Sequence, residues 1–235
     1  MNLFYSININ SEIVNLSEEE AKHCTKVLRL KNGDKIHLTD GKGNLYESEI
    51  IEIGLKKCSV KIVNTIKEYG KRNYKIHIAI APTKNIKRIE WFLEKATEIG
   101  IDEITPLICE HSERREIKTE RLNKVISSAV KQSLKAYHPK LNVPAKFGDF
   151  IDKKFNGQNF IAYCENDNQD LLKDIYKKKS DTLILIGPEG DFSDKEIKLA
   201  KDFGFIPISL GRSRLRTETA GIVACHTINL LNEEK

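Results

Sequence analysis

Short runs of alternating apolar and polar residues fill the first seventy positions, and turn residues separate the runs. This pattern is typical of β-strands and predicts three of them: 35–40, 45–53 and 58–63. One helix precedes them, because Ser17 and Glu20 have the spacing of a capping box. Apolar residues then recur on one helical face: Ala21, Cys24, Val27 and Leu28. We therefore predict a small β-rich domain over residues 1–72.

From residue 73 onward, strand-like and helix-like segments alternate. Buried strands are predicted at 75–82, 103–109, 158–164, 181–187 and 205–211. Helices are predicted at 85–100, 121–137 and 193–204, the last with a capping box from Ser193 to Glu196. The alternation predicts a largely parallel sheet with helices on both faces. A final helix over 218–231 is apolar nearly all round, so we expect it to be buried in its own domain or against a second subunit.

The composition narrows the class of protein. The 235 residues include 39 Lys and Arg against 34 Asp and Glu, a net charge of +5 that is compatible with a polyanionic partner. The five cysteines never form a C-x-x-C pair, and neither a secretory signal nor a membrane-spanning run is visible. We therefore expect a cytoplasmic protein with free thiols and no contact with membranes. Cys109–His111 could ligate a metal, but with no second cluster we expect none.

Three loops follow predicted strands at the end of the sheet where α/β proteins bind ligands. They begin at Cys164, Gly187 and Gly211. The second, GPEGDFS, has glycines that permit a tight turn and close approach of the backbone to a ligand. It lacks the glycine patterns of nucleotide-triphosphate and dinucleotide sites. An ordinary glycine turn leading into a capped helix remains an alternative on composition alone.

Two of these loops carry a resemblance to a known class. LILIGPEGDFSDKE followed by LGRSRLRTETA resembles the signature of the SPOUT-class RNA methyltransferases. LSEEEAKHCTKVLRLKNGDKIHLTDGKGNLYESEI near the start and KRIEWFLEKATEIGIDEITPLICEHSERR in the middle resemble the bacterial 16S ribosomal RNA uridine-N3 methyltransferases. The resemblance extends over almost the whole chain.

The resemblance implies an α/β fold in which a PUA-like RNA-binding β-barrel over 1–72 precedes a SPOUT domain over 73–235, with a parallel sheet and a C-terminal trefoil knot. It also implies a homodimer that acts on 16S ribosomal RNA, which we expect to be presented within the assembled small subunit, and S-adenosylmethionine as cofactor. The cofactor would be held by the strand end and the two glycine loops: Cys164, Gly187, Pro188, Glu189, Gly190, Leu210, Gly211 and Leu215.

The chain departs from the family pattern at three places. Asp191 stands where the second glycine of G-P-E-G-G is usual, and Ser213 and Arg214 replace the arginine and apolar residue of L-G-x-R-I-L-R. Lys135 stands where arginine is frequent after Gln-Ser. The match is complete at Arg216, Glu218 and Thr219.

Methylation at N3 of uridine requires removal of an imide proton and stabilisation of the anion that forms. Arginine stays protonated, so we assign Arg216 to charge stabilisation. Glu218 or Glu189 would accept the proton or orient Arg216. The alternative is that Arg216 and Glu218 form a structural ion pair that anchors the last helix, where an acidic residue is favourable in any case.

Basic side chains outside the pocket are candidates for phosphate binding: Lys22, His23, Lys26, Arg29, Lys84, Lys87, Arg88, Arg114 and Arg115. For any single lysine among them, a solvated surface position is the alternative. Two other functions stay open at this point. One is a different SPOUT activity, on another RNA or at a ribose 2′-oxygen, and the other is a non-catalytic RNA-binding module.

Overall fold

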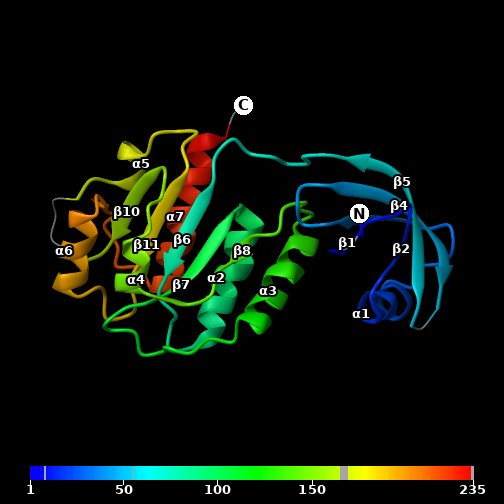
Figure 1. The fold of residues 1–235 in the computed structure, drawn as a ribbon, viewed down its shortest axis with the longest axis horizontal. Helices are drawn as coiled ribbons and strands as arrows, with labels where there is room; N and C mark the ends of the chain where they lie inside the picture. Colours follow the sequence, from blue (N-terminus) through cyan, green and yellow to red (C-terminus); the bar gives the residue numbers. More distant parts are fainter. Residues whose placement is uncertain (8, 55, 165–168, 234–235) are drawn as a thin grey trace. The chain divides into compact units, whose positions relative to one another are not determined.

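The computed structural model describes residues 1–7, 9–54, 56–164 and 169–233. The chain forms two compact units, and their helices and strands are labelled in Figure 1. The first unit contains Met1–Lys71 and Val130–His138, and the second contains Arg72–Ala129 and Pro139–Lys235. A short segment from the middle of the sequence therefore belongs to the N-terminal unit.

The first unit is built on a five-stranded sheet in the order β1-β3-β4-β5-β2. Its strands are β1 (Leu3–Tyr5), β2 (Ile13–Asn15), β3 (Lys35–Thr39), β4 (Leu45–Ile53) and β5 (Cys58–Ile66). β1 pairs with β3 in parallel, and the other neighbours are antiparallel. The three strands predicted from the sequence are confirmed as β3, β4 and β5. β1 and β2 were not predicted, because three residues are too few for an alternation to be recognised.

The predicted helix of this unit has two parts, α1 (Glu18–Lys22) and the π-helical turn η1 (His23–Val27). The Ser17 hydroxyl accepts a 3.3 Å hydrogen bond from the Glu20 amide, as the capping spacing predicts. Ala21 and Cys24 are fully buried. Val27 is 66% exposed, contrary to the prediction, because the wider π-helical turn rotates it away from the face that Ala21 and Cys24 share.

The helix predicted to reach residue 137 is shorter than expected. α3 (Thr119–Gln132) stops before Leu134, whose φ of +57° is left-handed and cannot continue a helix. The chain then joins the turn between β3 and β4. The Gly43 amide donates to the Ala136 carbonyl at 2.9 Å, and the His138 amide donates to the Gly41 carbonyl at 2.9 Å.

The second unit contains a seven-stranded sheet in the order β12-β10-β11-β6-β7-β8, with β9 also paired to β7. Its strands are β6 (Ile76–Ile80), β7 (Glu103–Ile108), β8 (Lys140–Leu141), β9 (Ala145–Lys146), β10 (Gln158–Ala162), β11 (Thr182–Ile186) and β12 (Ile206–Ile208). All of these pairings are parallel, which confirms the predicted sheet. Every residue of β6 and β11 is buried, as expected of central strands covered on both faces.

Helices cover both faces of this sheet (Figure 1). They are α2 (Ile86–Ile99), α4 (Phe147–Ile151), α5 (Leu172–Ile175), α6 (Asp194–Asp202) and α7 (Thr217–Asn232), together with most of α3. Residues of α4 and α6 pack with Ala79, Leu183 and Leu185 in one buried cluster. α2 and α7 pack together on the other face, where α7 also contacts β6 and β11. The capping box expected at Ser193 and Glu196 is present. Within the described residues, no helix has the length and apolar character needed to cross a membrane.

Candidate active site

The carboxyl ends of β10, β11 and β12 lie at the same end of the sheet, because these strands are parallel neighbours. Asp191, in the loop after β11, connects this loop to the one after β10. Its Oδ2 accepts a 2.8 Å hydrogen bond from the backbone amide of Cys164, at the end of β10. Two of the three predicted cofactor loops are therefore in contact. Of the first loop, Glu165 and Asn166 lie outside the described residues.

The loop after β11 is as tight as its glycines predict. Gly187 and Pro188 are buried, and a Cβ added to Gly187 would lie 3.1 Å from the ring of Phe192. A Cβ added to Gly190 would lie 3.2 Å from the Cβ of His111. The imidazole Nδ1 of His111 lies 3.1 Å from the Gly190 carbonyl oxygen. Neither glycine could take a larger side chain without displacing a neighbour.

The departure at Asp191 has a structural explanation. Its φ is +63°, a left-handed conformation that glycine adopts freely and that aspartate tolerates better than most residues. Its Oδ1 accepts a 2.8 Å hydrogen bond from the Phe192 amide, in addition to the bond that Oδ2 accepts from Cys164. The chain therefore keeps the backbone shape of a glycine loop and adds a carboxylate that holds the loop in place.

The loop between β12 and α7 contains Leu210, which is half-buried, and Gly211, which has a φ of +126°. The Gly211 amide donates to the Ser209 hydroxyl at 3.2 Å. Nothing lies within 4 Å of a Cβ added to Gly211, so this stretch of backbone is open to a ligand. Arg212 and Arg214 are exposed.

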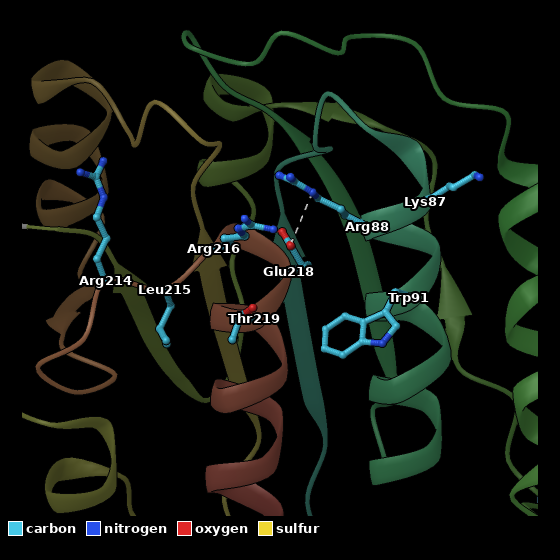
Figure 2. A pocket seen from close by; sticks show the side chains of 8 residues that line it. All are labelled: Lys87, Arg88, Trp91, Arg214, Leu215, Arg216, Glu218 and Thr219. Atoms are coloured by element: carbon cyan, nitrogen blue, oxygen red, sulfur yellow. Dashed lines mark ion pairs between the residues drawn. The ribbon is translucent and has the colours of Figure 1, made fainter.

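A pocket of about 550 Å³ lies between the first turns of α2 and α7 (Figure 2). This volume is in the usual range for a small-ligand site. α2 contributes Lys87, Arg88 and Trp91. The loop after β12 and the start of α7 contribute Arg214, Leu215, Arg216, Glu218 and Thr219. Four cationic side chains and one carboxylate thus line the pocket.

Glu218 is the buried charge of this pocket, with 6% of its surface exposed. Its Oε1 lies 3.8 Å from Nε of Arg88. Its Oε2 is buried and has no hydrogen-bond partner among the residues the structure describes. An unpartnered buried carboxylate oxygen is costly, which is typical of a group that serves a ligand. Arg216 occupies the N-cap position of α7 and is exposed, so its guanidinium is accessible to a ligand in the pocket.

Arg216 and Glu218, predicted as catalytic, and Leu215, predicted to bind the cofactor, line one pocket together with Trp91, which was not among the predicted site residues. The only signal was a lone tryptophan on an amphipathic helix, and 42% of its surface is exposed. Arg88 was predicted to bind phosphate, and in the structure its Nε faces Oε1 of Glu218 (Figure 2). Glu189 does not line this pocket; its Oε1 accepts a 3.0 Å hydrogen bond from the Lys84 amide.

The basic candidates of the first unit, Lys22, His23, Lys26 and Arg29, lie on α1, η1 and the turn that follows. Lys22 Nζ is 2.8 Å from Glu18 Oε1 on the same helix. His23 Nδ1 is 3.8 Å from Glu20 Oε2. Lys26 and Arg29 are exposed, and Arg29 has a φ of +54°.

The basic candidates of the second unit differ in their contacts. Arg114 donates to two backbone carbonyls, from Nε to Thr83 at 3.2 Å and from Nη2 to Lys84 at 2.7 Å. Arg115 donates from Nη2 to the Glu110 carbonyl at 3.1 Å. Lys84 Nζ forms an ion pair of 2.8 Å with a carboxylate of the same region, Glu113. These bonds give Arg114 in particular a structural role as a connector of two loops.

The cysteines are free thiols, and four of the five are buried. Burial raises the pKa of the Cys109 thiol far above its ordinary value, which keeps the group neutral. The described residues contain no cluster of three or more His, Cys, Asp or Glu side chains arranged to hold a metal ion.

Comparisons with known proteins show the family of the chain. Residues 70–229 match the RNA methyltransferase domain family, and residues 16–63 match the RNA methyltransferase PUA domain family. The ribosomal RNA small subunit methyltransferase E of Rickettsia conorii is 30% identical over 225 residues, which cover 94% of this chain and 91% of that protein.

Two solved structures are similar over nearly their whole lengths. A "probable rRNA-methyltransferase" from Porphyromonas gingivalis is 44% identical, with a TM-score of 0.92 and coverage of 99% of this chain and 98% of that one. The ribosomal RNA small subunit methyltransferase E of Neisseria gonorrhoeae, crystallised with S-adenosyl methionine, is 25% identical, with a TM-score of 0.90 and the same coverage.

The parallel sheet, the glycine loop and the cationic pocket at the strand ends are those of an RNA methyltransferase. Within that class, the chain belongs to the family of ribosomal RNA small subunit methyltransferase E.

Proposed function

We propose that the protein transfers a methyl group from S-adenosylmethionine to N3 of a uridine in the 16S ribosomal RNA of the small subunit. The pocket at the start of α7 carries this proposal, because it combines exposed arginines with a buried carboxylate whose Oε2 has no partner among the described residues. The names of the relatives support the same RNA class, and the Neisseria structure supports the cofactor.

The chain offers a suitable place for the cofactor at the three strand ends. Asp191 holds the first two loops together, and the Gly211 backbone faces open space. We assign cofactor contacts to these loops, mainly through backbone groups: Cys164, Gly187, Pro188, Glu189, Gly190, Leu210, Gly211 and Leu215. When bound, S-adenosylmethionine supplies a sulfonium methyl group, which the electron pair of N3 takes up as the carbon–sulfur bond breaks.

Two residues perform the chemistry on the base. Glu218 accepts the N3 proton, because its carboxylate is buried in the pocket and its Oε2 has no partner among the described residues. Arg216 stabilises the negative charge that spreads to O2 or O4. Glu189 is less suited to this role, because its carboxylate accepts a bond from the Lys84 amide. Its assigned role is therefore to hold the cofactor loop.

Primer extension on 16S ribosomal RNA tests the reaction. N3 methylation blocks the Watson–Crick edge, so reverse transcriptase should stop at one uridine in RNA from cells with the gene and read through without it. A mark at a ribose 2′-oxygen would stop the enzyme only weakly. An unchanged pattern would support a non-catalytic module instead, and calorimetry with S-adenosylmethionine would then show whether the pocket still binds it.

The assignment of Arg216 has its own test. Arg216→Ala should reduce methyl transfer to small subunits by about 100-fold or more, the size of effect seen when one transition-state donor is removed. The affinity for S-adenosylmethionine, measured by calorimetry, should change little. An Arg216→Ala enzyme with full activity would leave the arginine with a structural role only.

The proposal includes an arrangement of domains and subunits. Residues 1–72 form the RNA-binding domain, which the PUA family match at 16–63 supports, and residues 73–235 form the catalytic domain.

The path of the chain supports a trefoil knot. After the edge strand β12, the chain crosses back over the sheet, and α7 packs on the inner strands β11 and β6. A homodimer is supported by the second face of α7, where Leu230 is 58% exposed. We propose that the dimer acts in the cytoplasm on the assembled small subunit, and sedimentation equilibrium would test its mass.

A further inference from the structure

Two arginines and one carboxylate of the pocket can form hydrogen bonds with a base: Arg88, Arg216 and Glu218. Glu218 Oε2 is a buried acceptor, with no partner among the described residues. In Figure 2 the guanidinium groups of Arg88 and Arg216 both lie toward the Glu218 carboxylate, one from α2 and one from the start of α7. Arginine only donates hydrogen bonds and an ionised carboxylate only accepts them. The pocket therefore offers one acceptor, with a donor directed toward it from each of the two helices.

Uracil has the complementary order on its Watson–Crick edge: an acceptor at O4, a donor at N3–H and an acceptor at O2. Cytosine has a donor at its amino group and acceptors at N3 and O2, so its N3 lone pair would face the carboxylate. A buried carboxylate opposite a lone pair loses its hydrogen bond and is repelled. The triad thus favours uracil and rejects cytosine.

Trp91 supplies a flat surface beside this triad. Its indole is 42% exposed and lies across the pocket from Thr219, below the guanidinium of Arg88 (Figure 2). Enzymes that act on a base flipped out of the stack read its Watson–Crick edge with polar groups and hold its face against aromatic side chains. Lys87, from the preceding turn, points away from the triad in Figure 2, so it is placed for phosphate rather than for the base.

We infer that this pocket is the uracil-recognition site. Trp91 stacks on the flipped base, and Glu218 accepts a hydrogen bond from N3–H. Of Arg88 and Arg216, one donates to O4 and the other to O2. The inference rests on the proposed function and adds two residues to it. Arg88, expected from the sequence to bind phosphate, becomes a specificity-determining residue, and Trp91 becomes the residue that positions the base.

The first experiment compares variants on unmethylated small subunits. Trp91→Ala should weaken subunit binding about 5- to 150-fold, the loss expected when one base loses its aromatic partner, whereas Trp91→Phe should stay within about threefold of the wild type. Phe203→Ala is the matched control, because Phe203 is a similarly exposed aromatic residue outside the pocket, at the end of α6. Equal effects of Trp91→Ala and Phe203→Ala would overturn the stacking role.

The second experiment measures the choice of base by equilibrium competition, without any methyl transfer. Subunits that carry cytidine at the modified position should bind the wild-type enzyme at least tenfold more weakly than those with uridine. Glu218→Gln and Arg88→Gln should bring the two affinities close together, because the altered side chains no longer match uracil alone. A wild-type enzyme that binds both subunits equally, or variants that keep the full preference, would overturn the inference.

The single tryptophan of the chain provides an independent signal, since its emission reports this pocket alone. Hexauridylate should quench it more than hexacytidylate at equal occupancy, with occupancy determined by filter binding. Equal quenching by both would contradict the inference. If the wild type methylates subunits but these recognition tests fail, only the uracil site is wrong. If it does not methylate them at all, the proposed function fails first.

Discussion

Asp191 holds a left-handed backbone conformation at a position where the resembling family usually has glycine. For most residues this conformation costs about 1–2 kcal/mol, and somewhat less for aspartate. The two hydrogen bonds that its carboxylate accepts, from the amides of Cys164 and Phe192, offset that cost. The loop is therefore fixed by a side chain instead of being left to the freedom of glycine.

Substitutions at Asp191 should separate these two contributions. Asp191→Gly removes the hydrogen bonds without adding strain, so we expect a loss of about 1 kcal/mol in the free energy of unfolding. Asp191→Ala removes the bonds and leaves a Cβ in the left-handed region, so we expect about 2 kcal/mol. Asp191→Asn keeps one acceptor oxygen and should lose least. Urea denaturation measures all three, and equal losses for Gly and Ala would show that the backbone is not strained.

The residues of the pocket differ in how well the sequence predicted them. Arg216 and Glu218 were predicted because they lie two positions apart in one motif. Trp91 and the pairing of Arg88 with Glu218 were not predicted, because α2 and α7 meet only in the folded chain. The spacing of residues along a chain says little about which helices will lie side by side.

At the scale of elements, α7 is held by close contact along one face. A Cβ added to Gly221 would lie 2.6 Å from a ring carbon of Phe92 on α2 and 3.0 Å from Cδ1 of Ile80 on β6. The N-terminal end of the same helix carries Arg216 and Glu218. The depth at which α7 packs therefore determines where these two side chains, the proposed catalytic residues, lie.

Gly221→Ala should destabilise the protein by about 1–3 kcal/mol through overpacking, although alanine is the better helix former. Methyl transfer should fall as well, because the start of α7 must shift. Gly148→Ala is the matched control: this glycine is exposed on helix α4, and nothing lies within 4 Å of an added Cβ. It should leave stability equal or slightly higher. Thermal unfolding and the transfer assay together test both variants, and a neutral Gly221→Ala would show that the contact can relax.

The long elements were predictable and the short ones were not. Apolar periodicity located α2, α6, α7 and the central strands to within a few residues. It failed for the short strands β1, β2, β8 and β9 and at the end of α3, where the left-handed Leu134 stops the helix. Leucine gives no turn signal of its own; that conformation comes from the contacts of the following segment with the turn at Gly41–Gly43.

At the scale of the whole molecule, the parallel sheet followed from the alternation of strands and helices, but its strand order did not. β10 lies between β12 and β11, and β6 follows β11, an order that no local pattern encodes. Only the resemblance to a family could suggest it. Two further properties depend on the whole chain: its stability in mild acid and the salt dependence of RNA binding.

Stability should fall in mild acid because of His77. This side chain is 7% exposed, its Nε2 lies 2.8 Å from the Thr105 hydroxyl, and burial lowers its pKa from 6.5 to about 4, despite the nearby Glu103. Between these two values the unfolded chain binds a proton that the folded chain does not. We expect a loss of about 1–2 kcal/mol between pH 6.5 and pH 5. Denaturation of His77→Gln over the same range should show a smaller loss, and an unchanged pH profile would assign the effect to other groups.

Binding of the small subunit should depend on salt, since the chain carries a net charge of +5 and neutralised phosphates release counterions. The two groups of basic residues should differ. Lys26→Gln on the first unit should reduce the slope of log affinity against log salt by about 1, with little effect on stability. Arg114→Gln should leave the slope nearly unchanged and instead lower the free energy of unfolding by about 1–2 kcal/mol, because Arg114 bonds to the Thr83 and Lys84 carbonyls. Filter binding at several salt concentrations, together with denaturation of each variant, distinguishes a phosphate contact from a structural one, and the opposite result would exchange the two roles.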